Sequence, residues 1–431
     1  MRTYYLSKKW NWSSTRSLCF SLLMMFFFTA CKEDYTGKYK MTDGLPVITF
    51  IRYQNVDQAE QLLDGAYMGD NIVVIGDNLT SVQEVWFNNV KALLNINLIT
   101  KNSLFVNVPK DLPSVRTDKI YFVTGKKDTV KYDFEVKIPA PILARMKCEF
   151  VPEGYETVLF GDYFLAPDAS TIKVFIGDYE IPTSDIVSYE KTKIVFKAPP
   201  MDVKGQVEVK TLYGNSGRTK DVFRDDRGWI TGFEDTENGG DGFAPGWGRP
   251  KRIEEDPAYS LMGKYVRLAG SLDPGDNPGF VSGYDDMIIN IWSSVNSGIS
   301  NPMFSSDPKT STLKFEVNVI QAWSAAPMIF FFDADGNNEA GWWADGTHPR
   351  AFWVPWLSTG SYISDGWETV SIPLSQFKYN GAGAVVPEAT SFGVLGIGVH
   401  NRGADGKEGR PNYGGTACNP VILIDNIRVI P

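Results

Sequence analysis

The chain has 431 residues, enough for roughly two to four domains of ordinary size. With 22% charged and 43% hydrophobic residues, it has the composition of a folded globular protein, which excludes a disordered or fibrous chain. Aromatic residues reach 13% but histidines number only 2, which favours binding surfaces over histidine-based chemistry. Asp and Glu total 51 against 42 Lys and Arg, and phosphate binding needs clustered basic residues, so no nucleic-acid partner is expected.

The N-terminus has the features of an export signal. Four basic residues precede an apolar run, Leu18 to Phe28, which ends at Thr29-Ala30-Cys31. This order is typical of a signal peptide, which we place at 1–30. The run is about half as long as a membrane-spanning helix. Removing the signal peptide changes the net charge from −9 to −13, because it carries four basic and no acidic residues.

The junction Phe28-Thr29-Ala30-Cys31 resembles a bacterial lipobox, although Phe28 stands where Leu is usual. The following Lys32-Glu33-Asp34 resembles the acidic tag that routes Bacteroidota lipoproteins to the outer face of the outer membrane. The resemblance implies lipidation at Cys31 and a cell outer membrane protein that faces the exterior. Residues 31–44 would then be a tether. The alternative is an ordinary signal peptide followed by an incidental cysteine.

The remaining cysteines, Cys148 and Cys418, are too far apart in sequence to indicate a disulfide framework. No CxxC motif or Cys/His cluster indicates a metal site. The acidic stretch from Asp333 lacks the glycine and glutamate that a calcium loop needs at its sixth and twelfth positions, so a hairpin turn explains it better. We expect no cofactor and no metal.

Strand signals begin near residue 45 and repeat. The run Ile72 to Leu79 (IVVIGDNL) recurs 85 residues later as Thr157 to Phe164 (TVLFGDYF). In both copies an aromatic strand follows, and then a strand that closes at a proline, Pro109 or Pro199. Such a repeat predicts two copies of one small antiparallel sandwich.

These two segments, 45–138 and 139–224, resemble the immunoglobulin-like IPT/TIG fold in the order of the Gly-Asp turn, the aromatic strand and the strand that ends in proline. The resemblance implies that both domains act as spacers. Trp86 and Phe87 are neighbours on one strand, so one side chain faces inward and the other outward. We expect Trp86 to pack in the core or at a domain interface.

From Trp229 onward the composition changes. Nine of the ten tryptophans that follow the signal peptide lie between residues 229 and 367. Strand-like runs joined by long Gly, Ser and Asp-rich loops continue to the final run, Val421 to Ile430, and no helical periodicity appears. We predict one larger jelly-roll-like β-sandwich over 225–431 and an all-β chain overall.

The final ILIDNIRV resembles the last strand of jelly-roll carbohydrate-binding modules. Together with the lipobox and the IPT/TIG repeats, it makes the mature chain similar to the surface glycan-binding proteins of Bacteroidota polysaccharide-utilisation loci, of the type with a C-terminal xyloglucan-binding domain. The resemblance implies a non-catalytic lipoprotein that captures a β-glucan, xyloglucan or similar plant polysaccharide before its degradation and import. Outer-membrane lipid and a glycan transporter complex of the same locus are the other implied partners.

Carbohydrate binding needs flat aromatic side chains, because a pyranose has an apolar face. Aromatic residues in loop-like sequence are therefore the predicted carbohydrate-binding residues: Trp323, Trp353, Trp356, Trp292 and Tyr362. Trp229 and Trp367 stand at strand starts and are expected in the core or an interface. The pair Trp342-Trp343 is ambiguous, because alternation exposes one of the two rings if the segment is extended.

Two other functions stay open. A jelly-roll glycoside hydrolase or lyase needs two carboxyl groups across a cleft, but Glu254-Glu255-Asp256 and Asp285-Asp286 are explained more simply as solvated loops. His348 and His400 lack a nucleophile motif, so we predict no catalytic residue. A protein-binding adhesin would instead gather its aromatic residues into one contiguous apolar patch.

Overall fold

The computed structural model describes residues 41–234, 253–274, 287–292, 307, 309–333, 348–386, 394–401, 405–407 and 409–431. Their regular structure consists of β-strands and single-turn 3-10 helices, which confirms the all-β prediction. The signal peptide and Cys31 lie outside these ranges. Among the described residues, no helix has the length and hydropathy of a membrane span.

The chain forms two compact units, 1–139 and 140–431. The first contains the predicted domain 45–138, and the second contains both 139–224 and 225–431.

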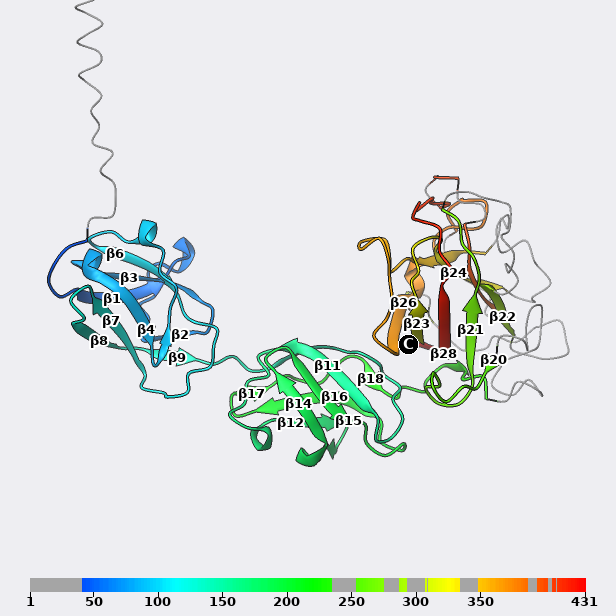
Figure 1. The fold of residues 1–431 in the computed structure, drawn as a ribbon, viewed down its shortest axis with the longest axis horizontal. Helices are drawn as coiled ribbons and strands as arrows, with labels where there is room; N and C mark the ends of the chain where they lie inside the picture. The colour runs from blue at the N-terminus through cyan, green and yellow to red at the C-terminus, as the bar shows by residue number, and fades with distance from the viewer. Residues whose placement is uncertain are drawn as a thin grey trace, which may run out of the picture. The chain divides into compact units, whose positions relative to one another are not determined.

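The first unit is an immunoglobulin-like sandwich (Figure 1). One layer has the order β1 (Val47–Tyr53), β3 (Asn71–Asp77), β6 (Ser103–Asn107). The other has the order β5 (Val90–Lys91), β4 (Val82–Phe87), β7 (Lys119–Thr124), β8 (Thr129–Asp133). The short strands β2 (Gly65–Tyr67) and β9 (Glu135–Lys137) pair in parallel. Three 3-10 turns join strands: η1 (Val56–Gln58), η2 (Leu79–Ser81) and η3 (Ile96–Leu98).

Strand β4 shows how alternation divides the adjacent aromatic residues. Phe87 is buried in the core and lies 6.0 Å from Phe134, measured between ring centroids. Trp86 faces the other way: its Nε1 donates a 3.0 Å hydrogen bond to Glu84, and the Lys91 ammonium lies 5.6 Å from its ring centroid. One ring is inward and one outward, as predicted, but Trp86 does not fill the core.

The N-terminal half of the second unit repeats this architecture. One sheet has the order β10 (Ile142–Met146), β11 (Glu156–Asp162), β15 (Lys193–Lys197), β14 (Ile186–Glu190). The other has the order β13 (Tyr179–Glu180), β12 (Lys173–Ile176), β16 (Gly205–Thr211), β17 (Gly214–Asn215), and β18 (Val222–Phe223) also pairs with β16. The turns η4 (Ala169–Thr171) and η5 (Thr183–Asp185) complete it.

The repeated Gly-Asp motif has one structural role in both copies. The pairing of β1 with β3 slips between Ile48 and Phe50, opposite Gly76, and the pairing of β10 with β11 slips in the same way opposite Gly161. A Cβ atom at Gly76 would lie 1.9 Å from the carbonyl oxygen of Val47. At Gly161 it would lie 2.0 Å from the carbonyl oxygen of Ile142. The motif therefore marks a β-bulge that only glycine permits.

The C-terminal half of the second unit is a larger sandwich. One sheet has the order β20 (Ile253–Glu254), β21 (Tyr265–Ala269), β28 (Val421–Ile430), β23 (Thr312–Gln321), β26 (Glu368–Pro373), and β19 (Trp229–Thr231) also pairs with β28. The facing sheet has the order β22 (Ile288–Trp292), β27 (Val394–Val399), β24 (Met328–Asp333), β25 (Arg350–Trp353). The turn η10 (Leu374–Gln376) follows β26. The core lies between the two sheets.

Buried charges join the two halves of the second unit. Lys314 of β23 donates to Glu149 at 2.5 Å and to Asp221 at 2.6 Å. Arg428 of β28 donates to Glu149 at 2.7 Å and to Glu316 at 2.8 Å. Burial raises the pKa of Glu316, and the positive charge of Arg428 opposes that rise. Each charged group of this network has a close opposite charge, and removing one partner would leave the other buried and unpaired.

Aromatic side chains border this network. The rings of Trp229 and Phe150 have centroids 5.5 Å apart. Trp367 packs against the core of the immunoglobulin-like half, and its Nε1 donates to the carbonyl oxygen of Tyr259 at 2.8 Å. The prediction that Trp229 and Trp367 serve a core or an interface is confirmed.

Candidate glycan-binding surface

Two loops that carry predicted site residues meet at one end of the C-terminal sandwich. Residues 322–327 cross from β23 to β24, and residues 354–364 follow β25. The backbone amide of Trp323 donates to the carbonyl oxygen of Tyr362 at 3.0 Å, and the amide of Tyr362 donates to the carbonyl oxygen of Trp323 at 2.9 Å. Trp323, Trp353, Trp356 and Tyr362 are thereby brought together, and we call them the aromatic cluster.

Two members of the aromatic cluster are core residues. Trp323 is 0% exposed and Trp356 is 2% exposed. The indole Nε1 of Trp323 donates to the carbonyl oxygen of Ala325 at 2.7 Å, and that of Trp356 donates to the carbonyl oxygen of Ala326 at 3.0 Å. Neither ring offers a face to a ligand in this structure, contrary to the expectation that each stacks on a sugar.

The conformation of the loop after Trp323 explains why both indole rings are buried. The Ala-Pro-rich sequence after Trp323 does form a loop, as predicted, but Ala326 adopts a left-handed conformation with φ of 64°. The loop turns back at this point, so its carbonyl groups receive the two indole N–H groups. A loop that covers the end of a sandwich needs large side chains beneath it, and these two indoles fill that space.

The other two members lie at the surface. Trp353 and Tyr362 are partly exposed and pack against the core. The Trp353 ring centroid lies 5.5 Å from Trp323, 5.9 Å from Tyr362 and 6.0 Å from Phe315. An indole with neighbours on several sides and one side open can cover the apolar face of a sugar ring.

Two aliphatic side chains of the neighbouring loop are also exposed. Leu357 is 54% exposed and Ile363 is 58% exposed, and both belong to the loop 354–364. The same loop is anchored to the sheet through Ser364, whose hydroxyl accepts from the amide of Val319 at 2.7 Å and donates to Asn318 at 3.1 Å. The apolar surface therefore rests on a fixed backbone.

A second aromatic pair lies on the opposite face of β25. Phe352 alternates with the core residue Ala351, so it faces away from Trp353 and its ring centroid lies 6.3 Å from that of Tyr413. Burial raises the pKa of Tyr413, which keeps its hydroxyl neutral and able to donate a hydrogen bond. Sequence analysis did not single out this pair. Side chains alternate between the two faces of a strand, and this alternation along β25 could have indicated that residues 352 and 353 face opposite ways.

The side chains of several predicted residues lie outside the described residues. The backbone of Trp292 ends β22 opposite Val394, but its side chain lies outside what is described. Trp342, Trp343 and Asp285-Asp286 also fall outside the described residues, as does most of the acidic stretch from Asp333.

Two members of the acidic run 254–256 have local partners. Glu254 lies 3.8 Å from Arg267, and Asp256 accepts from the amide of Ala258 in an exposed turn. The buried carboxyls with raised pKa values, Glu316 and Asp425, lie with Arg428 in the interdomain network. Within the ranges that the structure describes, no group of three or more His, Cys, Asp or Glu residues is placed to hold a metal ion.

The two described cysteines are free thiols. Cys148 is buried, and burial raises its pKa well above the ordinary value. Such a thiol is protonated and unreactive.

Comparison with known proteins identifies the family. Residues 223–431 match the family model of the surface glycan-binding protein B xyloglucan binding domain. The chain is also similar to the crystal structure of the surface glycan-binding protein PbSGBP-B from Prevotella bryantii, with 31% identity over 91% of this chain and 100% of that one and a TM-score of 0.62. SGBP-B from a complex xyloglucan utilization locus in Bacteroides uniformis is 14% identical, with a TM-score of 0.46 over 90% of this chain and 99% of that one.

A curated relative, an IPT/TIG domain-containing protein of Bacteroides ovatus, is 25% identical over 165 residues, which is 36% of this chain. The matched part is 32% of that protein, so the chain spans about a third of its length. The similarity to PbSGBP-B, which extends over nearly the whole chain, is strong enough to assign the family. The chain therefore belongs to the surface glycan-binding protein B family.

Proposed function

We propose that the protein captures a neutral plant polysaccharide of the β-glucan type, such as xyloglucan, at the cell surface without cleaving it. One observation carries this proposal: the segment that matches a xyloglucan-binding domain, 223–431, is also the segment that holds the partly exposed aromatic surface at Trp353 and Tyr362. Family membership of nearly the whole chain supports it.

The chemistry of the surface suits a sugar. Trp353 covers the apolar face of one pyranose ring, and Tyr362, whose ring stands at 79° to the indole, borders that contact. Trp323 and Trp356 support the surface from beneath. The net charge of −13 after removal of the signal peptide favours a neutral ligand over an anionic one. An open surface of this kind binds in the micromolar to millimolar range, or about −4 to −8 kcal/mol.

The proposal includes the position of the protein in the cell. Acylation at Cys31 anchors it to the outer membrane and the acidic tag directs it outward, where a glycan transporter complex of the same locus receives the captured chain. Replacement of Cys31 by Ala is expected to abolish incorporation of labelled palmitate. Protease treatment of intact cells is expected to remove the wild-type protein. Retention of the label, or full protection from the protease, would contradict this part of the proposal.

Affinity electrophoresis of the mature chain through gels that contain xyloglucan, mixed-linkage glucan, mannan or xylan tests glycan capture. We expect retardation by at least one β-glucan, and at least a tenfold weaker interaction for Trp353→Ala, equivalent to about 1.4 kcal/mol. Trp86→Ala is the matched control, because Trp86 is an outward-facing tryptophan of the first unit. It should bind like the wild type.

Trp353 also packs against the core, so its variant requires a folding check by near-ultraviolet circular dichroism. Tyr362→Ala, which removes a more peripheral ring, provides a second test. The proposal fails if the folded protein is retarded by none of the glycans, or if Trp353→Ala and Tyr362→Ala both bind like Trp86→Ala. Release of reducing ends from the same glycans would favour the hydrolase alternative.

A further inference from the structure

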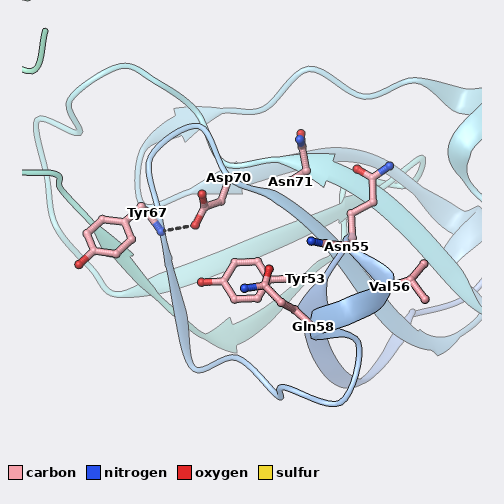
Figure 2. A pocket seen from close by; sticks show the side chains of 8 residues that line it. Tyr53, Asn55, Val56, Gln58, Tyr67, Asp70 and Asn71 are labelled. Carbon is pink, nitrogen blue, oxygen red and sulfur yellow. Dashed lines mark hydrogen bonds between the residues drawn. The ribbon is translucent and has the colours of Figure 1, made fainter.

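The first unit contains a cavity that sequence analysis did not single out. Its volume is about 710 Å³, which is within the range of small-molecule sites. It lies where the end of β1, the turn η1 and the turn between β2 and β3 meet (Figure 2). Two tyrosines, a carboxylate and several amides line it: Tyr53, Gln54, Gln58, Tyr67, Asp70 and Asn71.

The walls of this cavity are held by local hydrogen bonds. The amide of Tyr67 donates to the Asp70 carboxylate at 2.9 Å (Figure 2), and the amide of Asp70 donates back to the carbonyl oxygen of Tyr67 at 3.0 Å. Gly69, between them, has φ of 89°, which suits glycine. On the other side, the Asn55 side chain caps η1 by accepting from the amide of Asp57 at 3.1 Å. The lining residues therefore stand on two fixed turns.

The side chains of the cavity keep most of their hydrogen-bonding capacity. Among the described residues, no protein group bonds the hydroxyls of Tyr53 and Tyr67 or the side-chain amides of Gln54, Gln58 and Asn71. Tyr67 is 50% exposed. These groups offer both donors and acceptors, whereas no Lys, Arg or His is among the lining residues.

A cavity lined by tyrosines, unpaired amides and a carboxylate, with no basic residue, favours one class of ligand. A phosphate or carboxylate would need a basic partner and would be repelled by Asp70. An apolar ligand would leave the amides and hydroxyls unpaired. A sugar has an apolar ring face for a tyrosine and hydroxyl groups that both donate and accept hydrogen bonds for the amides and the carboxylate.

We propose that this cavity is a second carbohydrate-binding site, which takes a short segment of a neutral oligosaccharide. Tyr67 and Tyr53 contact the sugar rings, and Asp70, Gln58 and Asn71 bond their hydroxyls. The site goes beyond the proposed function, which places glycan binding in the C-terminal domain, and it gives the first immunoglobulin-like domain a role besides that of a spacer.

Isothermal titration calorimetry of the mature chain with cellotetraose and with a xyloglucan oligosaccharide, each at about 1 mM to match the expected affinity, tests the inference. The Trp353→Ala variant exposes the contribution of the cavity, because it is expected to weaken binding at the C-terminal surface at least tenfold. We expect this variant to keep binding one equivalent of one of these ligands. Adding Tyr67→Ala should weaken that binding at least tenfold, and adding Gln58→Ala should weaken it about threefold, since both side chains are exposed and their loss does not threaten folding.

Tyr155→Ala in the same background is the matched control, because Tyr155 is a 66% exposed tyrosine of the other immunoglobulin-like domain. It should leave binding unchanged. If Trp353→Ala abolishes all binding that the wild type shows, the cavity is not a site and the proposed function stands. If Trp353→Ala binds but Tyr67→Ala has no effect, the inference is also overturned. If Tyr67→Ala abolishes the wild-type binding while Trp353→Ala does not affect it, the inference holds and the proposed C-terminal site fails.

Discussion

The two immunoglobulin-like domains use the same end of their fold in opposite ways. Counted along the chain from the bulges opposite Gly76 and Gly161, residues Tyr53 to Asn55 of the first domain correspond to Cys148 to Phe150 of the second. In the second domain all three residues are buried, and two of them, Glu149 and Phe150, contact Arg428 and Trp229 of the C-terminal sandwich. In the first domain the corresponding tyrosine is half-buried and the two amides are exposed around the cavity.

The two copies differ here in their side chains and in the backbone that follows, because Asn55 begins the turn η1 whereas β10 already ends at Met146. A glutamate at the middle position neutralises two buried cations of the C-terminal half, whereas the side-chain amide of the corresponding glutamine, Gln54, bonds no protein group among the described residues. One scaffold thus provides a docking face in one copy and an open, polar and aromatic cavity in the other. Four predictions test this contrast.

The largest expected effect is at the middle position itself. Glu149→Ala leaves Lys314 and Arg428 buried without their shared partner, so we expect a loss of about 3–5 kcal/mol in the unfolding free energy of the second unit. Gln54→Ala, the equivalent change in the first unit, should stay within about 0.5 kcal/mol. Differential scanning calorimetry of both variants measures the two losses. Equal losses of unfolding free energy in the two variants would contradict the contrast between the two domains.

The shared bulge should respond alike in both copies. Gly76→Ala and Gly161→Ala each place a Cβ atom about 2 Å from a backbone carbonyl oxygen, so each should destabilise its own unit by about 1–3 kcal/mol. Gly125→Ala is a suitable control, because its new Cβ meets only side-chain atoms of Gln83 and Met41. Chemical denaturation provides the measurement, and a harmless alanine at either bulge would contradict the common register.

The second unit should lose stability as pH rises. Burial raises the pKa of Asp425, so the native state holds this proton more tightly than the unfolded chain, and the unfolding free energy falls above the unfolded pKa of about 3.9. Asp425→Asn removes this dependence and should stabilise the second unit by about 1 kcal/mol near neutral pH, with a smaller gain near about pH 4. Urea denaturation at both pH values checks it. A variant that is less stable at neutral pH would count against the assignment.

The stability of the first unit should depend on pH in the opposite direction. This is the smallest of the four expected effects. Hydrogen bonds from Trp86, Lys91 and Lys127 lower the pKa of Glu84 to about 2. Its contribution to stability is therefore complete above the ordinary pKa of 4.5 and is lost as pH falls towards about 2. Glu84→Gln should flatten the acid limb of the first unit's stability curve. A carboxyl titration followed by nuclear magnetic resonance would contradict this if Glu84 titrated at its ordinary pKa.

The sequence was sufficient for the fold class and the family, because these depend on patterns that recur along the chain. Alternation predicted the strands, and the repeated Gly-Asp motif predicted the two related domains. The site was harder to predict. The sequence around Trp323 indicates a loop but not what that loop covers, so Trp323 and Trp356 were expected at the surface and lie in the core.

Contacts between distant segments also escaped prediction. Tyr53 and Tyr67 share a cavity only because β1 and the turn before β3 meet in the folded domain. Glu149 meets Lys314 and Arg428 across large separations in sequence. No local sequence motif predicts these long-range contacts, because they depend on the order of strands in the sheets and on how the domains pack.

The rings around Trp353 have a consequence for which polysaccharides the proposed surface would capture. Phe315, Trp323 and Tyr362 hold this indole in place before any ligand arrives. A flexible side chain that becomes ordered on binding costs about 0.5–1.5 kcal/mol, and Trp353 has already lost that freedom on folding. The entropy lost on capture therefore falls mainly on the glycan. We expect the surface to favour stiff chains of regular conformation over flexible ones that carry the same hydroxyl groups.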